Sequence, residues 1–176
     1  GLLGIGGGLV MVPALSMMFA AQNLVPDSET LHMALGTSMA TIIFTAISSA
    51  RTHHQHDAVL WPVFRDMTPG ILAGTAIGTF FAASVPARPL AIFFACFVSL
   101  IAVQMALNFK PKPSRELPGT IGLIVTGLGI GAISSLVAIG GGALTVPFLT
   151  WCNVRVQNAI GTSAAIGLPI AIGGTL

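Results

Sequence analysis

The chain has 176 residues, of which 54% are hydrophobic and only 7% are charged, and its net charge at neutral pH is +2. Soluble domains carry about 25% charged residues, so this composition excludes a water-soluble globular domain. The net charge is small and the sequence has no basic stripe, which excludes nucleic acid as a partner. We therefore expect an all-α, polytopic integral membrane protein whose main partner is the lipid bilayer.

Four apolar segments in the first part of the chain are predicted to be membrane spans. A helix needs about twenty apolar residues to cross a hydrocarbon core of about 30 Å. Residues 51–68 hold most of the ionisable groups and are predicted to form an interfacial loop with a short amphipathic stretch. Residues 110–118 alternate proline and charge, which predicts an extramembrane loop. The predicted spans are residues 2–21, 32–50, 69–85 and 90–109.

The next apolar segment is too long for one crossing. Residues 119–151 carry no charge and would form a straight helix of about 50 Å. Such a segment must tilt strongly, break or turn back, and Gly140-Gly141-Gly142 together with Pro147 mark the place where a break costs least. Residues 153–157 then connect to a last predicted span that begins at Ala159.

Several glycines follow a spacing that is typical of helix packing. Gly70, Gly74 and Gly78 lie four residues apart in the third predicted span, and Gly127 and Gly131 repeat the spacing further along. Small residues at this spacing allow two helix backbones to approach closely in a membrane. We therefore predict a structural role for both sets.

Two blocks of sequence occur twice. GIGGGLVMVP at residues 4–13 returns as AIGGGALTVP at 138–147, and ALGTS at 34–38 returns as AIGTS at 159–163. An internal repeat in a chain of this composition is typical of a membrane transporter that is built from two related halves. Helix breaks are predicted at both glycine triplets and at Pro13 and Pro147.

The repeat divides the chain into two homologous halves. The first half covers residues 1–109, a loop covers 110–118, and the second half covers 119–176. From a comparison of the two copies, we expect the first half to lack its beginning and the second to lack its end. Four spans separate equivalent points, which favours halves that point the same way, but a re-entrant segment at either glycine triplet would make them inverted. The sequence leaves both arrangements open.

The repeated blocks contain the candidate substrate-binding residues. A helix that begins inside the membrane presents unpaired N–H groups and the positive end of its dipole, so it can hold an anion without a charged side chain. Hydroxyl groups also donate to anions, although they can instead bond carbonyls of their own helix. The alternative for all these small residues is helix packing. The candidates are Gly6, Gly7, Gly8, Gly36, Thr37, Ser38, Gly140, Gly141, Gly142, Gly161, Thr162 and Ser163.

Other chemistry has weaker support. His53, His54 and His56, followed by Asp57, could ligate a metal, but no cysteine or second ligand cluster accompanies them. The middle of every predicted span lacks Asp, Glu, Lys and Arg, so no proton relay is visible. No nucleophile–base pair is apparent either. We therefore expect no catalytic residues, no resident metal and no cofactor, and the protein is not expected to be an enzyme.

The distribution of basic residues predicts an orientation. If every span crosses once, the loops at 51–68 and 110–118 share one side and carry five Lys and Arg residues, whereas the other side has only Arg88 and Arg155. Cytoplasmic loops carry the excess of basic residues, so the first side is predicted to be cytoplasmic.

Taken together, the blocks GIGGGLVMVP, ALGTS, IGGGALTVP and AIGTS resemble those of the TauE/SafE family of sulfite and organosulfonate exporters. The resemblance implies a multi-pass transporter, commonly of a bacterial cytoplasmic membrane, with seven or eight helices in two related halves. It further implies export of sulfur-containing anions such as sulfite and sulfoacetate.

We therefore expect a transporter of a small anion, sulfite or an organosulfonate, that works by alternating access between its halves. Self-association into a homo-oligomer is left open. Two alternatives remain at this point. One is a metal-cation transporter that uses the His53, His54 and His56 loop, and the other is a non-transporting membrane scaffold.

Overall fold

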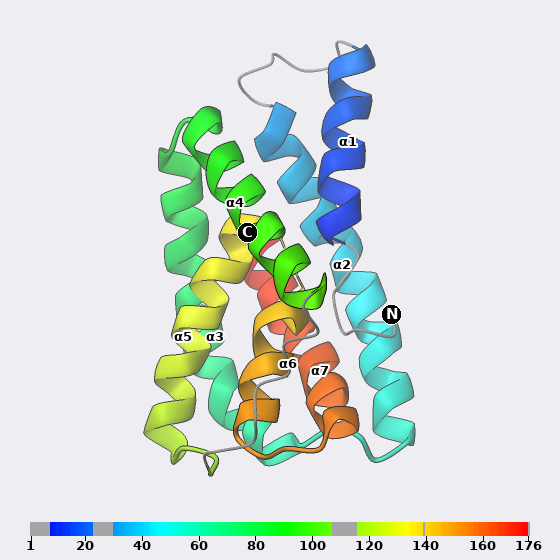
Figure 1. Cartoon of the computed structure of the whole chain (residues 1–176), viewed down its shortest axis with the longest axis vertical. Helices are drawn as coiled ribbons and strands as arrows, with labels where there is room; N and C mark the ends of the chain where they lie inside the picture. The colour runs from blue at the N-terminus through cyan, green and yellow to red at the C-terminus, as the bar shows by residue number, and fades with distance from the viewer. Residues whose placement is uncertain (1–7, 23–29, 107–115, 139, 176) are drawn as a thin grey trace.

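The computed structural model describes residues 8–22, 30–106, 116–138 and 140–175, and within these ranges every regular element is an α-helix (Figure 1). The predicted all-helical class is thus confirmed. The helices are α1 (Gly8–Gln22), α2 (Thr30–Gln55), α3 (Trp61–Ser84), α4 (Ala87–Ala106), α5 (Thr120–Val137), α6 (Gly142–Trp151) and α7 (Val156–Thr175).

Five of these helices, α2, α3, α4, α5 and α7, are long and apolar enough to cross a membrane. The prediction of a protein with several membrane spans is therefore confirmed. Helix α6 has only 10 residues and extends about 15 Å, which is half of a hydrocarbon core. It is therefore too short to cross the membrane.

The predicted interfacial loop at residues 51–68 is mostly helical, which corrects the expected boundaries. Helix α2 continues to Gln55 and α3 begins at Trp61, eight residues before the predicted start of that span. Pro62 lies in the first turn of α3, where the N–H that proline lacks would have no helical partner. Pro69 lies inside α3, but it is exposed, and the helix continues past it.

The long apolar segment is divided where the glycine triplet stands. Helix α5 ends at Val137, Ala138 adopts a left-handed conformation with φ of 51°, and α6 begins at Gly142. Gly141 precedes α6 with φ of 73°, a conformation that only glycine adopts without strain. Pro147 lies inside α6, and Pro13 lies inside α1. The predicted breaks at these two prolines are therefore wrong, because each helix continues past its proline.

Helices α3 and α5 pack along their whole length through the glycines that were predicted for packing. A Cβ atom on Gly127 would lie 2.6 Å from the carbonyl oxygen of Met67, and one on Gly131 would lie 2.5 Å from that of Ile71. Gly70 and Gly74 likewise approach the backbone of α5 too closely for any side chain. The predicted structural role of this spacing is confirmed.

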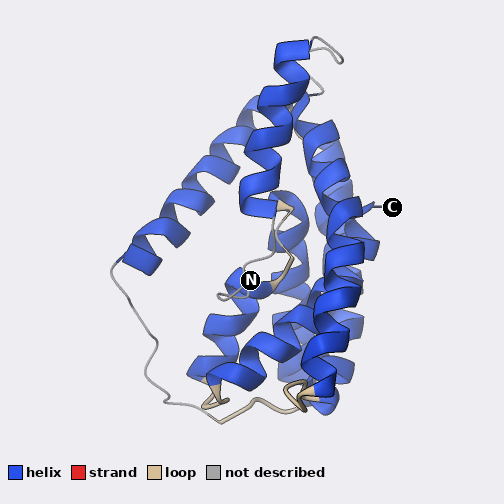
Figure 2. Ribbon diagram, turned by 90° about the vertical axis from the view of Figure 1, so that its right-hand side faces the viewer, coloured by secondary structure: helices blue, strands red, loops and turns tan. Residues whose placement is uncertain are grey.

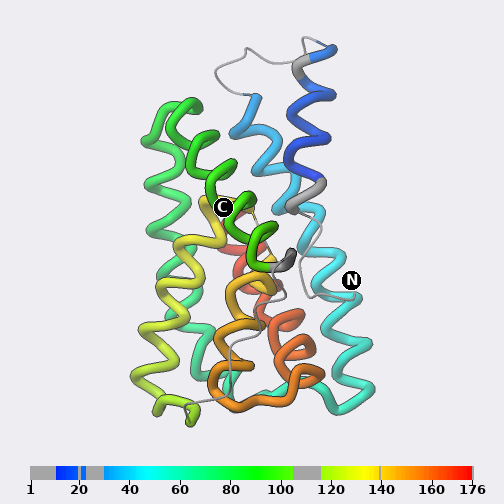
Figure 3. The backbone as a smooth tube through the Cα atoms, viewed as in Figure 1, coloured from blue at the N-terminus to red at the C-terminus, as the bar shows by residue number. Residues whose placement is uncertain are grey.

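The helices that carry the repeated blocks run in opposite directions. Helix α2 begins at the end of the molecule where α3 meets α4, and α7 begins at the other end, where α2 meets α3 (Figure 1). The two helices pack against each other, α1 packs on α2, and α6 packs on α7. The tube in Figure 3 shows that α1 and α6 both begin near mid-height and run to opposite ends.

Helix α4 lies outside this antiparallel core. It leans away from the other helices (Figure 2), and most of its residues are exposed.

Arg155, in the connection between α6 and α7, lies at the same end as Arg51 and Arg65, not with Arg88 as predicted. The reason is that α6 turns back instead of crossing.

Candidate functional site

The N-terminus of α6 is buried in the interior of the protein. Gly140, Gly141, Gly142 and Ala143 are all buried, and no described side chain caps this helix end by a hydrogen bond. The first regular helical bond is donated by the N–H of Thr145 to the Gly141 carbonyl at 2.9 Å. Two preceding N–H groups also have acceptors, since Gly142 donates to the Gly140 carbonyl at 2.9 Å and Leu144 to that of Gly141 at 3.3 Å. The buried helix start still carries the positive end of the helix dipole.

Helix α7 covers this buried helix end. A Cβ atom on Gly141 would lie 2.7 Å from Cδ1 of Ile170 and 3.4 Å from Cγ2 of Ile166. One on Gly167 would lie 3.0 Å from the carbonyl oxygen of Gly140. The second glycine triplet is therefore enclosed by the side of α7, and α7 would have to move before a ligand could reach it.

Three buried hydroxyl groups have no hydrogen-bond partner in the part of the chain that the structure describes: those of Ser38, Ser134 and Thr145. Their residues are between 0% and 2% exposed. Buried hydroxyls in proteins nearly always have a partner, because an unpaired one loses its hydrogen bonds to water. Ser134 lies in the last turn of α5 and Thr145 in the first turns of α6, so two of the three flank the break.

The other hydroxyls of the two GTS blocks already have partners. Thr37 donates to the carbonyl oxygen of Met33 at 2.7 Å, and Ser163 donates to that of Ile160 at 2.8 Å. Thr162 accepts a hydrogen bond of 2.9 Å from the N–H of Leu60, which precedes α3. Of the four predicted hydroxyl donors, only Ser38 is both buried and without a partner among the described residues.

The structure does not bring the two GTS blocks together. Thr37 lies in α2 beside the connection between α3 and α4, whereas Thr162 contacts Leu60 at the start of α3. Helix α3 has 24 residues, so about 36 Å separate its ends. Gly161 packs against Ala58 at the same end as Thr162. Gly6 and Gly7 lie outside the described residues, and Gly8 begins α1.

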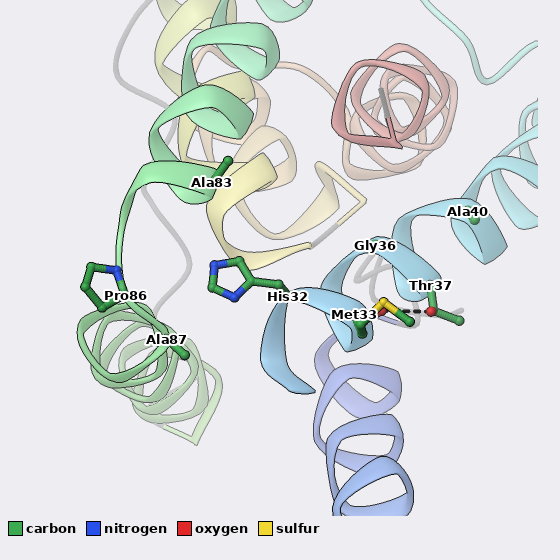
Figure 4. A pocket seen from close by; sticks show the side chains of 8 residues that line it. All are labelled: His32, Met33, Gly36, Thr37, Ala40, Ala83, Pro86 and Ala87. Atoms are coloured by element: carbon green, nitrogen blue, oxygen red, sulfur yellow. Dashed lines mark hydrogen bonds between the residues drawn. The ribbon is translucent and has the colours of Figure 1, made fainter. Parts of the chain in front are cut away.

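Gly36 and Thr37 line an open pocket of about 870 Å³ between α2 and the connection from α3 to α4 (Figure 4). The side chain of His32 points across it from α2 toward that connection, with Nε2 3.2 Å from the carbonyl oxygen of Ala82. A Cβ atom on Gly36 would meet nothing within 4 Å. The remaining lining is mostly apolar: Met33, Ala40, Ala83, Pro86 and Ala87.

The histidines near the end of α2 do not assemble into a metal site. Nε1 of Trp61 donates to Nδ1 of His54 at 3.3 Å, and the two rings meet edge to face. His53 and His56 lie nearby, but no group of three or more His, Cys, Asp or Glu residues within the described ranges could hold a metal ion. The geometry therefore gives the metal-transport alternative no support.

An all-helical membrane chain with a buried helix start between its long helices suits a transporter, and comparison with known proteins identifies which kind. Residues 1–176 match the family described as Sulfite exporter TauE/SafE. The chain belongs to this family. It is therefore a member of a family of membrane transporters and lies in contact with lipid.

The TauE/SafE chain is similar to several curated proteins over most of its length. A relative from Haemophilus influenzae, named "Probable membrane transporter protein", is 38% identical over 175 residues, which are 99% of this chain and 66% of the relative. YunE and YdhB of Bacillus subtilis, which carry the same description, are each 26% identical, and the matches cover 60% and 71% of their lengths. The chain thus spans about two thirds of these relatives. No solved structure matches it.

Sequence reasoning about this TauE/SafE chain missed Thr145 and Ser134. Thr145 occupies the position of the repeated block where the first copy has Met11, so the repeat gave no signal. Ser134 precedes the block altogether. The only available signal was a hydroxyl within an apolar helix next to a predicted break, and many helical hydroxyls meet that description without having a functional role.

Proposed function

We propose that the full-length protein moves a small anion, sulfite or an organosulfonate, across the cytoplasmic membrane of a bacterium. The observation that carries this proposal is the buried start of α6, which no described side chain caps. Every buried polar side chain in the described residues is a serine or a threonine, so neither a buried acid nor a buried base competes for a ligand there. Helix N–H groups in such a site favour an anion.

The chemistry of the expected cargo agrees with this site. A sulfite ion or a sulfonate group presents three oxygen atoms that accept hydrogen bonds, and Gly140–Gly142 leave the backbone without side chains that would keep these oxygens away. The family description, which names sulfite export, supports the same class of substrate.

The transport mechanism that we propose is alternating access between two inverted halves. The first half carries its blocks on α1 and α2 and the second on α6 and α7, and each pair runs opposite to the other. Because α6 turns back instead of crossing, an odd number of helix reversals relates the two copies. Inverted repeats are related by a pseudo-two-fold axis in the membrane plane, and rocking of one half against the other exposes a central site to each side in turn.

The described basic residues support an orientation for this transporter. Arg51, Arg65 and Arg155 lie at the end where α2 meets α3, and Arg88 lies at the other end. An excess of basic residues marks the cytoplasmic side. We therefore propose that the connections from α2 to α3 and from α6 to α7 face the cytoplasm.

The test is sulfite flux into proteoliposomes that contain the full-length protein, with sulfate and sulfoacetate as competitors. We expect saturable flux that Gly141→Ala reduces strongly, since a methyl group there strains a φ of 73° and collides with Ile170. The matched control is Gly129→Ala. A Cβ atom at this position meets nothing within 4 Å, so this variant should transport normally.

Folded protein that shows no flux of any of these anions would refute the proposal. A scaffold without transport activity gives this result, and it would leave the glycine triplet with a role in packing alone. Equal flux for the two alanine variants would show that the start of α6 is not part of the pathway.

A further inference from the structure

We propose that the hydroxyl group of Thr145 donates a hydrogen bond to the transported oxyanion at the start of α6, an inference that rests on the anion transport proposed above. Thr145 is 0% exposed, and its Oγ1 has no hydrogen-bond partner among the described residues. A hydroxyl held in the interior without an acceptor is unfavourable unless a ligand supplies one.

The other threonine of the same helix shows what an ordinary structural hydroxyl does. Thr150 donates to the carbonyl oxygens of Val146 and Pro147 at 2.9 and 3.0 Å. The same bonding to the preceding turn occurs at Thr41 and Thr126. The Thr145 hydroxyl does not bond to the preceding turn in this way, although the Gly141 carbonyl lies one turn before it and accepts its backbone N–H.

The position of the hydroxyl fits a ligand at the helix start. Oγ1 of Thr145 lies 3.8 Å from the point that a Cβ atom on Gly141 would occupy, so it stands beside the residue that precedes α6. This hydroxyl thus adds a neutral donor beside the positive end of the α6 dipole. The dipole attracts an anion, and the hydroxyl can donate to one of the oxygens of a small oxyanion.

The site is closed in this structure by Ile166 and Ile170 of α7, which face Gly141. Binding therefore requires these side chains to move away from the start of α6. The ligand class that follows is a compact oxyanion, since a bulky organic group would have to displace the isoleucines further.

The experiment compares Thr145→Val, Thr145→Ser and the control Thr150→Val in the full-length protein. Thermal unfolding in detergent is followed against sulfite concentration, and sulfite flux is measured in proteoliposomes. We expect Thr145→Val to weaken the sulfite response and to raise KM about tenfold, the effect of one lost hydrogen bond to an anion. Thr145→Ser and Thr150→Val should respond as the wild type does.

Without sulfite, Thr145→Val should unfold at the same temperature as the wild type or higher, because it removes an unpaired buried hydroxyl. A normal sulfite response in Thr145→Val, or a loss of stability without sulfite, would overturn the inference. A wild-type protein that neither transports nor is stabilised by sulfite, sulfate or sulfoacetate would instead overturn anion transport itself, and with it the inference.

Discussion

The hydroxyl of Thr162 links two parts of the chain that are 102 residues apart, because it accepts the N–H of Leu60 just before α3 begins. This N–H would otherwise lack an acceptor at a helix start. The sequence predicts this residue as an anion contact, and in the structure its hydroxyl joins the start of α3 to α7.

We expect Thr162→Val to lower the free energy of unfolding by about 1–2 kcal/mol, since the N–H of Leu60 loses its partner. Thermal unfolding of the purified full-length protein measures the change. Thr162→Ser keeps the acceptor and should lose less. The control Thr126→Val removes a hydroxyl that bonds only its own helix, so a loss as large as that of Thr162→Val would contradict the assignment.

At the scale of residues, the sequence singles out candidate groups but does not show what each one bonds. Thr37, Thr162 and Ser163 were recognised through the repeat, yet their hydroxyls bond protein groups, two of them within their own helix. Spacing along the chain cannot decide between a carbonyl of the same helix and a ligand, because both lie within reach of a hydroxyl. Thr145 was missed because Met11 takes its place in the first copy.

At the scale of elements, the contact between α3 and α5 depends on backbone approach. Gly131 faces the carbonyl oxygen of Ile71 so closely that a methyl group must push the two helices apart. Gly129, in the same helix, faces open space. The two positions therefore form a matched pair.

We expect Gly131→Ala to destabilise the protein by about 1–3 kcal/mol through overpacking. Gly129→Ala should be neutral or stabilising by up to about 1 kcal/mol, the difference in helix propensity. Thermal unfolding of both variants in the same detergent tests this. Equal effects at the two positions would mean that α3 and α5 are not held together at Gly131.

Helix existence was predictable here and helix boundaries were not. Apolar length alone predicted the five long helices. The start of α3 was misplaced because Arg65, Asp66 and Pro69 read as a loop, whereas the structure keeps them in the helix, with Asp66 accepting a hydrogen bond from the hydroxyl of Thr120. Proline and charge alone therefore do not mark a helix boundary, since α3 continues past Pro69, its ninth residue.

At the scale of the whole molecule, the direction of α7 relative to α2 depends on α6. A segment of 10 residues that turns back places the connection from α6 to α7 on the same side as the connection from α2 to α3. A helix that crossed the membrane would place them on opposite sides. Counting spans in the sequence favoured the crossing, because nothing in its composition distinguishes a half-helix from the end of a long one.

Single cysteines can distinguish the two arrangements. After removal of Cys96 and Cys152, the exposed residues His56, Gln157 and Ser84 are each replaced by cysteine in the full-length protein. We expect a membrane-impermeant maleimide to label positions 56 and 157 from the same side, the cytoplasmic one, and position 84 from the other. Labelling of positions 56 and 157 from opposite sides would refute the inverted arrangement.

The depth at which α6 begins has an electrical consequence. Its ten residues place its N-terminus about 15 Å from the end of the molecule that we propose faces the cytoplasm, which is close to the midpoint of a membrane. Moving one elementary charge across a membrane potential of 100 mV changes its free energy by about 2.3 kcal/mol. An anion that reaches this helix end from the cytoplasm has passed through about half of that drop, so the membrane voltage itself would act on the occupancy of the site.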